Sequence, residues 1–140
     1  MSKIAVVYWS GTGNTQQMAE AVAGGAKKAG AEAELKFVSD FTADMMDNYD
    51  AVAFGCPSMG SEELEDSEFQ PVFEACEAKL SGKKIALFGS YGWGDGEWMR
   101  TWADTCKNDG AVLAAEPVIC NDAPDDDALA QCDALGAALA

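Results

Sequence analysis

The stretch that decides the fold is KIAVVYWSGTGNTQQMAEAVAGGAKKAG, residues Lys3 to Gly30. Its first part, Lys3 to Tyr8, is a nearly continuous run of apolar and β-branched residues, which is typical of a strand buried on both faces. Apolar residues later recur at four-residue spacing over 15–29, which predicts a helix, and Gly30 stands where a helix stop is expected. Glycine and hydroxyl residues fill the loop between them. The stretch therefore predicts a strand, a polar loop and a helix in direct succession.

The same order repeats along the rest of the chain. Further strands are predicted at Ala33 to Val38, Ala51 to Gly55, Lys84 to Gly89 and, in a more broken form, Ala111 to Cys120; further helices are predicted at Ser67 to Leu80, Glu97 to Asp109 and Asp125 to Leu139, with a weaker one at Phe41 to Asp47. Strands that alternate with helices pair in parallel, because each connection crosses over the sheet. The pattern predicts an α/β fold with helices on both faces of a parallel sheet. At 140 residues, without a linker or repeat, we expect one domain over 1–140.

The charge balance narrows the choice of partners. The formal net charge is −15 at pH 7, so a nucleic acid or an anionic membrane would be repelled, and a basic protein surface is the natural counterpart. The same charge favours a monomer, because copies of the chain repel one another. No apolar stretch approaches the ~20 residues of a membrane span, and we expect no signal peptide.

Cysteine and histidine usage argue against several kinds of chemistry. The five cysteines are widely spaced and form no CxxC pair, which argues against a metal site or a disulfide framework and favours a reducing cytoplasm. The chain has no histidine, the commonest general base near neutral pH. An enzyme that shuttles protons is therefore disfavoured. Cys56 ends a predicted strand, and we interpret it as a buried packing residue.

Three loops follow predicted strands at the sheet edge where ligands of open α/β folds bind. They read WSGTGNT, CPSMGSEELEDSE and SYGWGDGEW. The first leads straight into a helix N-terminus, whose N–H groups and dipole favour an anion, and a phosphate is the best candidate. It lacks the GK[ST] ending of a P-loop and the third glycine of the dinucleotide fingerprint. An ordinary capped polar turn remains the alternative for this loop taken alone.

The other two loops offer flat apolar surfaces. Trp93 is flanked by glycines at 92, 94 and 96, which favours an indole presented on the loop. Met59 precedes Gly60, and five carboxylates follow within seven positions; four of them fit a solvated face, and one near Gly60 could accept a hydrogen bond from a ring imide. A phosphate loop with two such walls predicts a slot for a flat heteroaromatic mononucleotide.

The motifs SGTGNT, MGSEELEDSEF and FGSYGWGDGEWMR resemble those of the short-chain flavodoxins of anaerobic bacteria, and the similarity extends from Lys3 to the last helix. The resemblance implies a doubly wound, five-stranded parallel sheet with strand order 2-1-3-4-5, non-covalent FMN as the cofactor, and no metal. It also implies a low-potential one-electron carrier that shuttles between semiquinone and hydroquinone and serves redox partner proteins, without a substrate of its own.

The resemblance also assigns the cofactor-binding residues, all of them by position. They are Ser10, Gly11, Thr12, Gly13, Asn14 and Thr15 in the first loop, Ser58, Met59, Gly60, Ser61 and Glu62 in the second, and Ser90, Tyr91, Gly92, Trp93 and Gly94 in the third. The first loop should wrap the 5′-phosphate, with Ser58 and Ser90 near the ribityl chain or phosphate. Trp93 should cover the outer face of the ring and Met59 the inner face.

Further roles follow from the same resemblance. Glu62 should accept from the flavin N3–H, while Gly92 and the Trp93 backbone line the pyrimidine edge. The peptide between Gly60 and Ser61 should turn over on reduction, which glycine permits because it tolerates positive φ.

Other functions on the same fold are weighed against this reading. A flavin reductase using NAD(P)H would need a nicotinamide pocket, and no second nucleotide loop is found. A phospho-receiver domain would need acids where Tyr8 to Ser10 and Gly55 to Cys56 stand, and a phosphatase would need an arginine after Cys56. Trp98 and Trp102 are four residues apart on a predicted helix, which favours packing over flavin stacking. For Trp9 three positions stay open: in the core, at the rim of the core, or against the ribityl chain of the cofactor.

Overall fold

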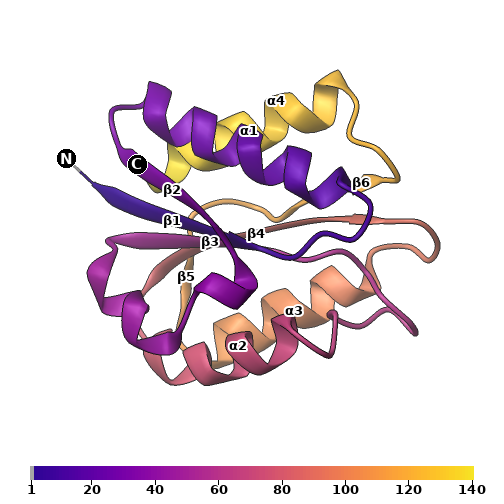
Figure 1. Cartoon of the computed structure of the whole chain (residues 1–140), viewed down its shortest axis with the longest axis horizontal. Helices are drawn as coiled ribbons and strands as arrows, with labels where there is room; N and C mark the ends of the chain where they lie inside the picture. The colour runs from indigo at the N-terminus through magenta and orange to yellow at the C-terminus, as the bar shows by residue number, and fades with distance from the viewer. Residues whose placement is uncertain (1) are drawn as a thin grey trace.

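The computed structural model describes residues 2–140, and its strands form one parallel sheet between two layers of helices (Figure 1). The strands are β1 (Lys3–Tyr8), β2 (Glu32–Phe37), β3 (Ala51–Gly55), β4 (Lys84–Tyr91), β5 (Val112–Leu113) and β6 (Val118–Asn121). The helices are α1 (Asn14–Lys28), α2 (Phe69–Cys76), α3 (Glu97–Asn108) and α4 (Asp126–Leu139). The strand order is β2-β1-β3-β4-β5, as expected.

The last position of the sheet is split. Both β5 and β6 pair in parallel with β4, β5 near its start and β6 near its end, so the predicted strand Ala111 to Cys120 exists as two short pieces. Pro117 lies in the interruption and has no N–H to donate to a ladder. The end of β6 still reaches the carboxyl edge of the sheet, beside the end of β4.

Two helices cover each face of the sheet. Figure 1 shows α1 and α4 above the sheet and α2 and α3 below it. One buried cluster lies under α1 and α4 and includes Ile4, Val6 and Phe88; the other lies under α2 and α3 and includes Val7 and Phe54. Neighbouring residues of β1 thus point to opposite faces, as alternation along a strand requires. The strands are apolar on both faces for this reason.

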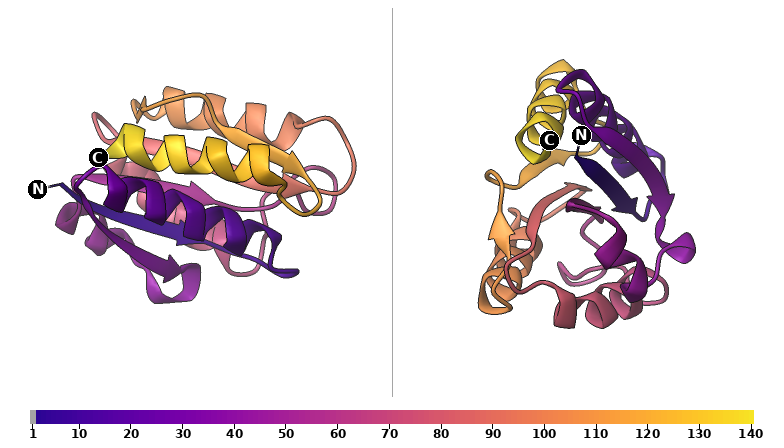
Figure 2. Two further views of the ribbon diagram at one scale, coloured as in Figure 1. Left: turned by 90° about the horizontal axis from the view of Figure 1, so that it is seen from above. Right: turned by 90° about the vertical axis from the view of Figure 1, so that its left-hand side faces the viewer.

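Helices α1 and α4 lie side by side along their lengths (Figure 2). Their backbones touch at two glycines: a Cβ at Gly25 would overlap the carbonyl of Asp133, and one at Gly136 would overlap the carbonyl of Val22. The side chains of Lys28 and Asp133 add an ion pair of 2.6 Å across the same contact. The position of α1, and of its N-terminus, is therefore set by close packing against α4.

Two helix predictions needed correction. The expected helix Ser67 to Leu80 begins later, at Phe69, and passes into a 3-10 turn at Glu77–Lys79. The weaker helix expected at Phe41 to Asp47 is a 3-10 helix, Ala43–Asn48, which follows a shorter one at Val38–Asp40.

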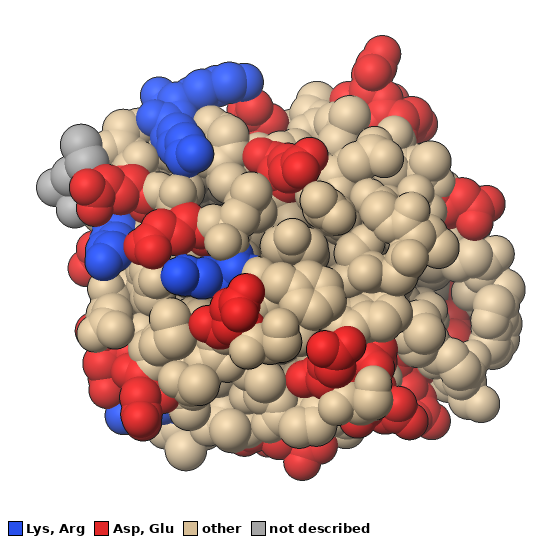
Figure 3. Space-filling view, viewed as in Figure 1, with Lys and Arg blue, Asp and Glu red and all other residues tan. Residues whose placement is uncertain are grey.

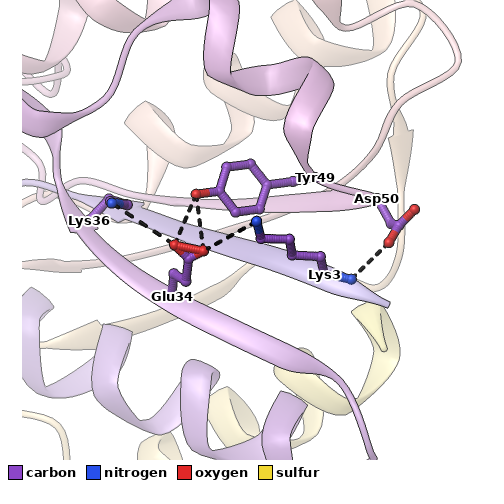
Figure 4. Close-up of polar contacts among 5 residues, drawn as sticks. All are labelled: Lys3, Glu34, Lys36, Tyr49 and Asp50. Carbon is purple, nitrogen blue, oxygen red and sulfur yellow. Dashed lines mark hydrogen bonds and ion pairs between the residues drawn. The ribbon is translucent and has the colours of Figure 1, made fainter. Parts of the chain in front are cut away.

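A polar network closes the amino end of the sheet, away from the three loops (Figure 4). Glu34 on β2 accepts from the Tyr49 hydroxyl at 3.3 Å and lies 3.8 Å from Lys3 and 4.0 Å from Lys36. The Lys3 N–H donates to Asp50 at 2.7 Å. Burial, and then the charge of Glu34, raise the pKa of Tyr49. Within the described residues no helix is both long and apolar enough to cross a bilayer.

Candidate cofactor-binding site

The first loop turns tightly between β1 and α1. Gly13 precedes the helix with φ of +96°, a conformation that favours glycine, and its carbonyl accepts the first helical bond from Gln17 at 3.1 Å. Its N–H donates to Ser10 Oγ at 3.1 Å, which holds the turn closed. Gly13 has no side chain to cap α1, and the Asn14 N–H makes only a long hydrogen bond, 3.5 Å, to the Thr12 hydroxyl. Unsatisfied N–H groups at such a start are suited to an anion.

Thr15 supplies the clearest sign of a ligand-binding site. Its side chain is only 1% exposed, and within residues 2–140 its hydroxyl oxygen has no hydrogen-bond partner. A buried hydroxyl without a partner costs about 1–3 kcal/mol, so such groups are rare in native proteins. An anion seated on the loop would supply the acceptor. The loop therefore fits the phosphate of FMN.

The second loop, after β3, is closed by a pair of backbone bonds. Met59 and Glu63 each donate to the other's carbonyl at 2.8 Å, and between them Gly60 and Glu62 have φ of +54° and +56°. The Met59 side chain is 38% exposed. The pair presents Met59 and the Gly60–Ser61 peptide at the carboxyl edge of the sheet.

Glu65 anchors the base of this loop. Its carboxylate is 5% exposed and accepts from the N–H groups of Ser67, Glu68 and Phe69 at 3.0, 2.8 and 2.8 Å, and from the Ser67 hydroxyl. Burial raises its pKa, but these hydrogen bonds outweigh burial and leave the pKa below its usual value. Glu65 thus takes the place of a cap at the start of α2 and ties that start to the loop.

Cys56 also contacts the base of the loop. Its sulfur accepts from the Glu65 N–H at 3.3 Å. The side chain is fully buried, and burial strongly raises the pKa of the thiol, so it stays neutral and unreactive. The interpretation of Cys56 as a packing residue is confirmed.

The third loop presents its tryptophan to solvent. Trp93 is 61% exposed, and Gly94 and Gly96 beside it have φ of +86° and +93°. Glu62 of the second loop accepts from the Asp95 N–H at 3.1 Å, and its carboxylate fills the space where a Cβ on Gly94 would lie. The second and third loops are thus joined at the residue expected to meet the flavin N3–H.

The remaining expected residues lie around these contacts. The Ser58 N–H donates to the Ser90 carbonyl at 3.0 Å, which continues the ladder between β3 and β4. Ser90 itself is buried, and its hydroxyl donates to the Asp122 carbonyl at 2.6 Å. Tyr91 is half-buried and packs on Trp98 with ring centres 5.5 Å apart. The hydroxyl of Ser90 is therefore used inside the protein.

Sequence reasoning missed the fourth loop, which follows β6. Asp122 has φ of +55°, its N–H donates to the Tyr91 carbonyl at 2.8 Å, and its side chain lies near Gly92. The signal was the same one that selected the other loops, a polar segment at the carboxyl end of a strand. The broken fifth strand concealed it.

The buried tryptophans confirm the packing interpretation. Trp98 and Trp102 are 2% and 3% exposed, and the Trp98 indole N–H donates to the Cys56 carbonyl at 3.1 Å. Trp9 is half-buried at the rim of the lower core, and its indole N–H donates to Glu68 at 3.0 Å.

The fold and the site together define a doubly wound α/β protein in which the three loops expected to bind the cofactor lie at the carboxyl ends of β1, β3 and β4. Comparison with known proteins narrows this class. The sequence profile of the family described as Flavodoxin matches residues 6–134, and the chain belongs to the flavodoxin family.

Individual relatives span almost the whole chain. The flavodoxin of Clostridium beijerinckii is 48% identical over 121 residues, 86% of this chain and 88% of that protein. The flavodoxin of Megasphaera elsdenii is 44% identical over 137 residues, 98% of both chains. The solution structure of two-electron reduced Megasphaera elsdenii flavodoxin superposes with a TM-score of 0.90 over 97% of each chain, at 45% identity.

Family membership confirms three expectations. The chain is a flavodoxin-type electron transfer protein, FMN is its cofactor, and it is an electron carrier rather than an enzyme. The hydrogen-bonding capacity left at Thr15 and at the start of α1 fits this cofactor, because a phosphate would satisfy both. When bound, FMN supplies the redox chemistry, and the protein supplies its position and surroundings.

Proposed function

We propose that this protein carries one electron at a time between redox partner proteins, with its FMN cycling between semiquinone and hydroquinone. One observation carries this proposal. The buried Thr15 hydroxyl, which has no hydrogen-bond partner, lies at the same edge of the sheet as two exposed apolar side chains, Trp93 and Met59. The first suits a phosphate and the others suit a flat ring, so together they suit a single flavin mononucleotide.

The phosphate is held without any lysine or arginine in its loop. The Thr15 hydroxyl and the N–H groups of Asn14, Thr15 and Gln16 at the start of α1 bind its oxygens, while Thr12 and Asn14 contribute side-chain donors. The α1 dipole adds a favourable field for the dianion. Gly11 and Gly13 allow the backbone to approach closely.

The ring lies between Trp93 on its outer face and Met59 on its inner face. Glu62 accepts from the N3–H of the ring while it still accepts from the Asp95 N–H, because a carboxylate has two oxygens. Gly92 and the Trp93 backbone border the pyrimidine edge. The peptide between Gly60 and Ser61 would turn over on reduction and offer its carbonyl as an acceptor to the reduced ring, and the positive φ of Gly60 supports this.

The placement of acidic groups favours a low reduction potential of the flavin and a partner protein with a basic surface. In the view of Figure 3, the lysine and arginine atoms gather on the left, around the amino end of the sheet, and only acidic groups are coloured on the right, where the three loops lie. Carboxylates near the site oppose a further negative charge on the ring, which lowers the potential of the second electron. The same carboxylates steer a basic docking face to the exposed edge of the flavin.

The protein acts as a monomer in a reducing cytoplasm. The net charge of −15 supports the monomer, because copies repel one another, and the five free cysteines support the compartment.

An anaerobic titration of the FMN-reconstituted protein with dithionite, followed by visible absorption, tests this function. We expect the yellow oxidised spectrum to pass through a blue neutral semiquinone before it bleaches. NADH or NADPH alone should leave the flavin oxidised. Direct two-electron bleaching by either nicotinamide would instead identify a reductase, and a failure to take up FMN would remove the site.

A further inference from the structure

Trp9 lies beneath the phosphate loop. A Cβ built on Gly11 would lie 2.9 Å from Cη2 and 3.3 Å from Cζ3 of the Trp9 indole, so the loop backbone rests directly on the six-membered ring. The backbone N–H of Trp9 donates to the Gly55 carbonyl at 3.0 Å, which extends the pairing of β1 with β3. The loop thus sits on a side chain whose own backbone is fixed.

The outer end of the same indole is also fixed. Its Nε1–H donates at 3.0 Å to a carboxylate oxygen of Glu68, which is 59 positions away in the sequence. Glu68 precedes α2, and its own N–H donates to the buried carboxylate of Glu65. Glu65 in turn anchors the loop that carries Met59 and the Gly60–Ser61 peptide. One chain of contacts therefore runs from the phosphate loop to the loop that borders the ring.

The carboxylate of Glu68 is not expected beside a phosphate loop on grounds of charge. A negative group there opposes a dianion, and the Glu68 side chain is exposed, so packing does not account for its position either. An acceptor for the indole N–H accounts for it, because a hydrogen bond to an ionised acceptor is stronger and more directional than one to a neutral acceptor.

We propose that Trp9 and Glu68 form a brace that holds the phosphate loop in its binding geometry, which makes Trp9 a positioning residue for the phosphate group of FMN. The inference rests on the proposed binding site. Because the brace acts on the phosphate end, its loss weakens the contribution of the phosphate and spares the contacts made by the ring.

Riboflavin, which lacks the phosphate, separates the two contributions. In the apoprotein, Trp9→Phe removes the Nε1–H and the outer ring edge under Gly11 but keeps an aromatic side chain. We expect the Kd for FMN, measured by quenching of flavin fluorescence, to rise about fivefold to tenfold, which is the net contribution of one solvent-exposed hydrogen bond. The Kd for riboflavin should change less than about twofold.

Two variants of Glu68 separate the hydrogen bond from the charge. Glu68→Gln keeps an acceptor oxygen for the indole and removes the charge, so FMN should bind as tightly as in the native protein or more tightly. Glu68→Ala removes both, and its loss of FMN affinity should not add to that of Trp9→Phe in the double variant. Glu68→Ala also carries the test if Trp9→Phe fails to fold.

Trp93→Ala is the matched control for the ring end, since it should raise the Kd values for FMN and riboflavin by the same factor. The brace is refuted if Trp9→Phe and Glu68→Ala leave the ratio of the two Kd values at its native value. A native apoprotein that binds FMN no more tightly than riboflavin would instead refute the proposed phosphate site.

Discussion

At the scale of single residues, Glu62 links two loops of the site through its side chain. One of its oxygens accepts from the Asp95 N–H at 3.1 Å, and its backbone is held at a positive φ that most side chains avoid. Both features fix the direction of the carboxylate. They make Glu62 a rigid acceptor at the place proposed for the ring, in contrast to its exposed neighbour Glu63.

We expect Glu62→Gln to raise the potential of the second electron by roughly 50–100 mV, because the variant removes a nearby negative charge and leaves a single acceptor oxygen for both the N3–H and the Asp95 N–H. The matched control is Glu63→Gln, which removes the same charge one residue away and should shift the potential much less. Spectroelectrochemical titration of both reconstituted variants measures the difference. Equal shifts would mean that Glu62 acts through its charge alone.

The sequence predicted the exposure of some residues of the site but could not predict the contacts of others. Met59 and Trp93 were recognised because glycines beside a large apolar residue mark an exposed side chain, and both are exposed. Glu65 and Glu68 were placed within a run of carboxylates typical of a solvated face. Their partners lie on other elements or across a turn, and only the folded chain brings them together.

At the scale of elements, the start of α2 depends on one buried carboxylate. We expect Glu65→Gln to lower the free energy of unfolding of the apoprotein by about 2 kcal/mol at pH 7, since an amide replaces an ionised group that accepts four hydrogen bonds. The pKa of Glu65 is lowered in the fold, so folding favours its ionised form.

The sign of the pH dependence follows from that shift. The contribution of Glu65 is complete above the pKa of an unfolded glutamate, about 4.3, and is lost as the pH falls through the lower value in the folded protein. Urea unfolding of native and variant protein at pH 7 and below pH 4 should therefore show a gap that narrows in acid. Asp66→Asn, at an exposed neighbour, should leave stability nearly unchanged at both pH values.

The packing of α1 on α4 gives a second prediction at this scale. We expect Gly25→Ala to destabilise the protein by about 1–3 kcal/mol, because its Cβ would overlap the backbone of α4. Gly24→Ala is the matched control: no atom lies within 4 Å of its Cβ, and alanine should stabilise the helix by about 0.5–1 kcal/mol. Thermal unfolding of both variants tests this, and a shift of the same sign in both would contradict it.

Elements were predicted well where local sequence decides them. The bounds of β1 and β3 agree with prediction, because each is a short apolar run that ends at polar or turn residues. The start of α2 was placed too early because the N–H groups of Ser67 and Glu68 bind the Glu65 side chain. The division of the last strand was anticipated only as a broken pattern, since its two pieces are defined by pairing with β4.

At the scale of the whole molecule, charge is distributed unevenly over the face seen in Figure 3. We expect electron transfer from the reduced protein to a basic cytochrome c to slow as ionic strength rises from 10 to roughly 300 mM, because salt screens the attraction between exposed charges. Stopped-flow rates measure this. Reduction of a neutral small-molecule acceptor serves as the control, and its rate should depend little on salt. If the rate of electron transfer to cytochrome c also depended little on salt, electrostatic docking would be contradicted.

The Thr15 hydroxyl, which has no hydrogen-bond partner, sets the stability of the apoprotein against its affinity for FMN. A chain optimised only for folding would replace it with a residue that fits the buried space without a polar group, and Thr15→Val should raise the melting temperature of the apoprotein while it weakens FMN binding. Calorimetry of the empty protein and flavin titration measure the two effects separately. A bound phosphate would relieve this local cost, so that ligand binding and folding stability are coupled at Thr15.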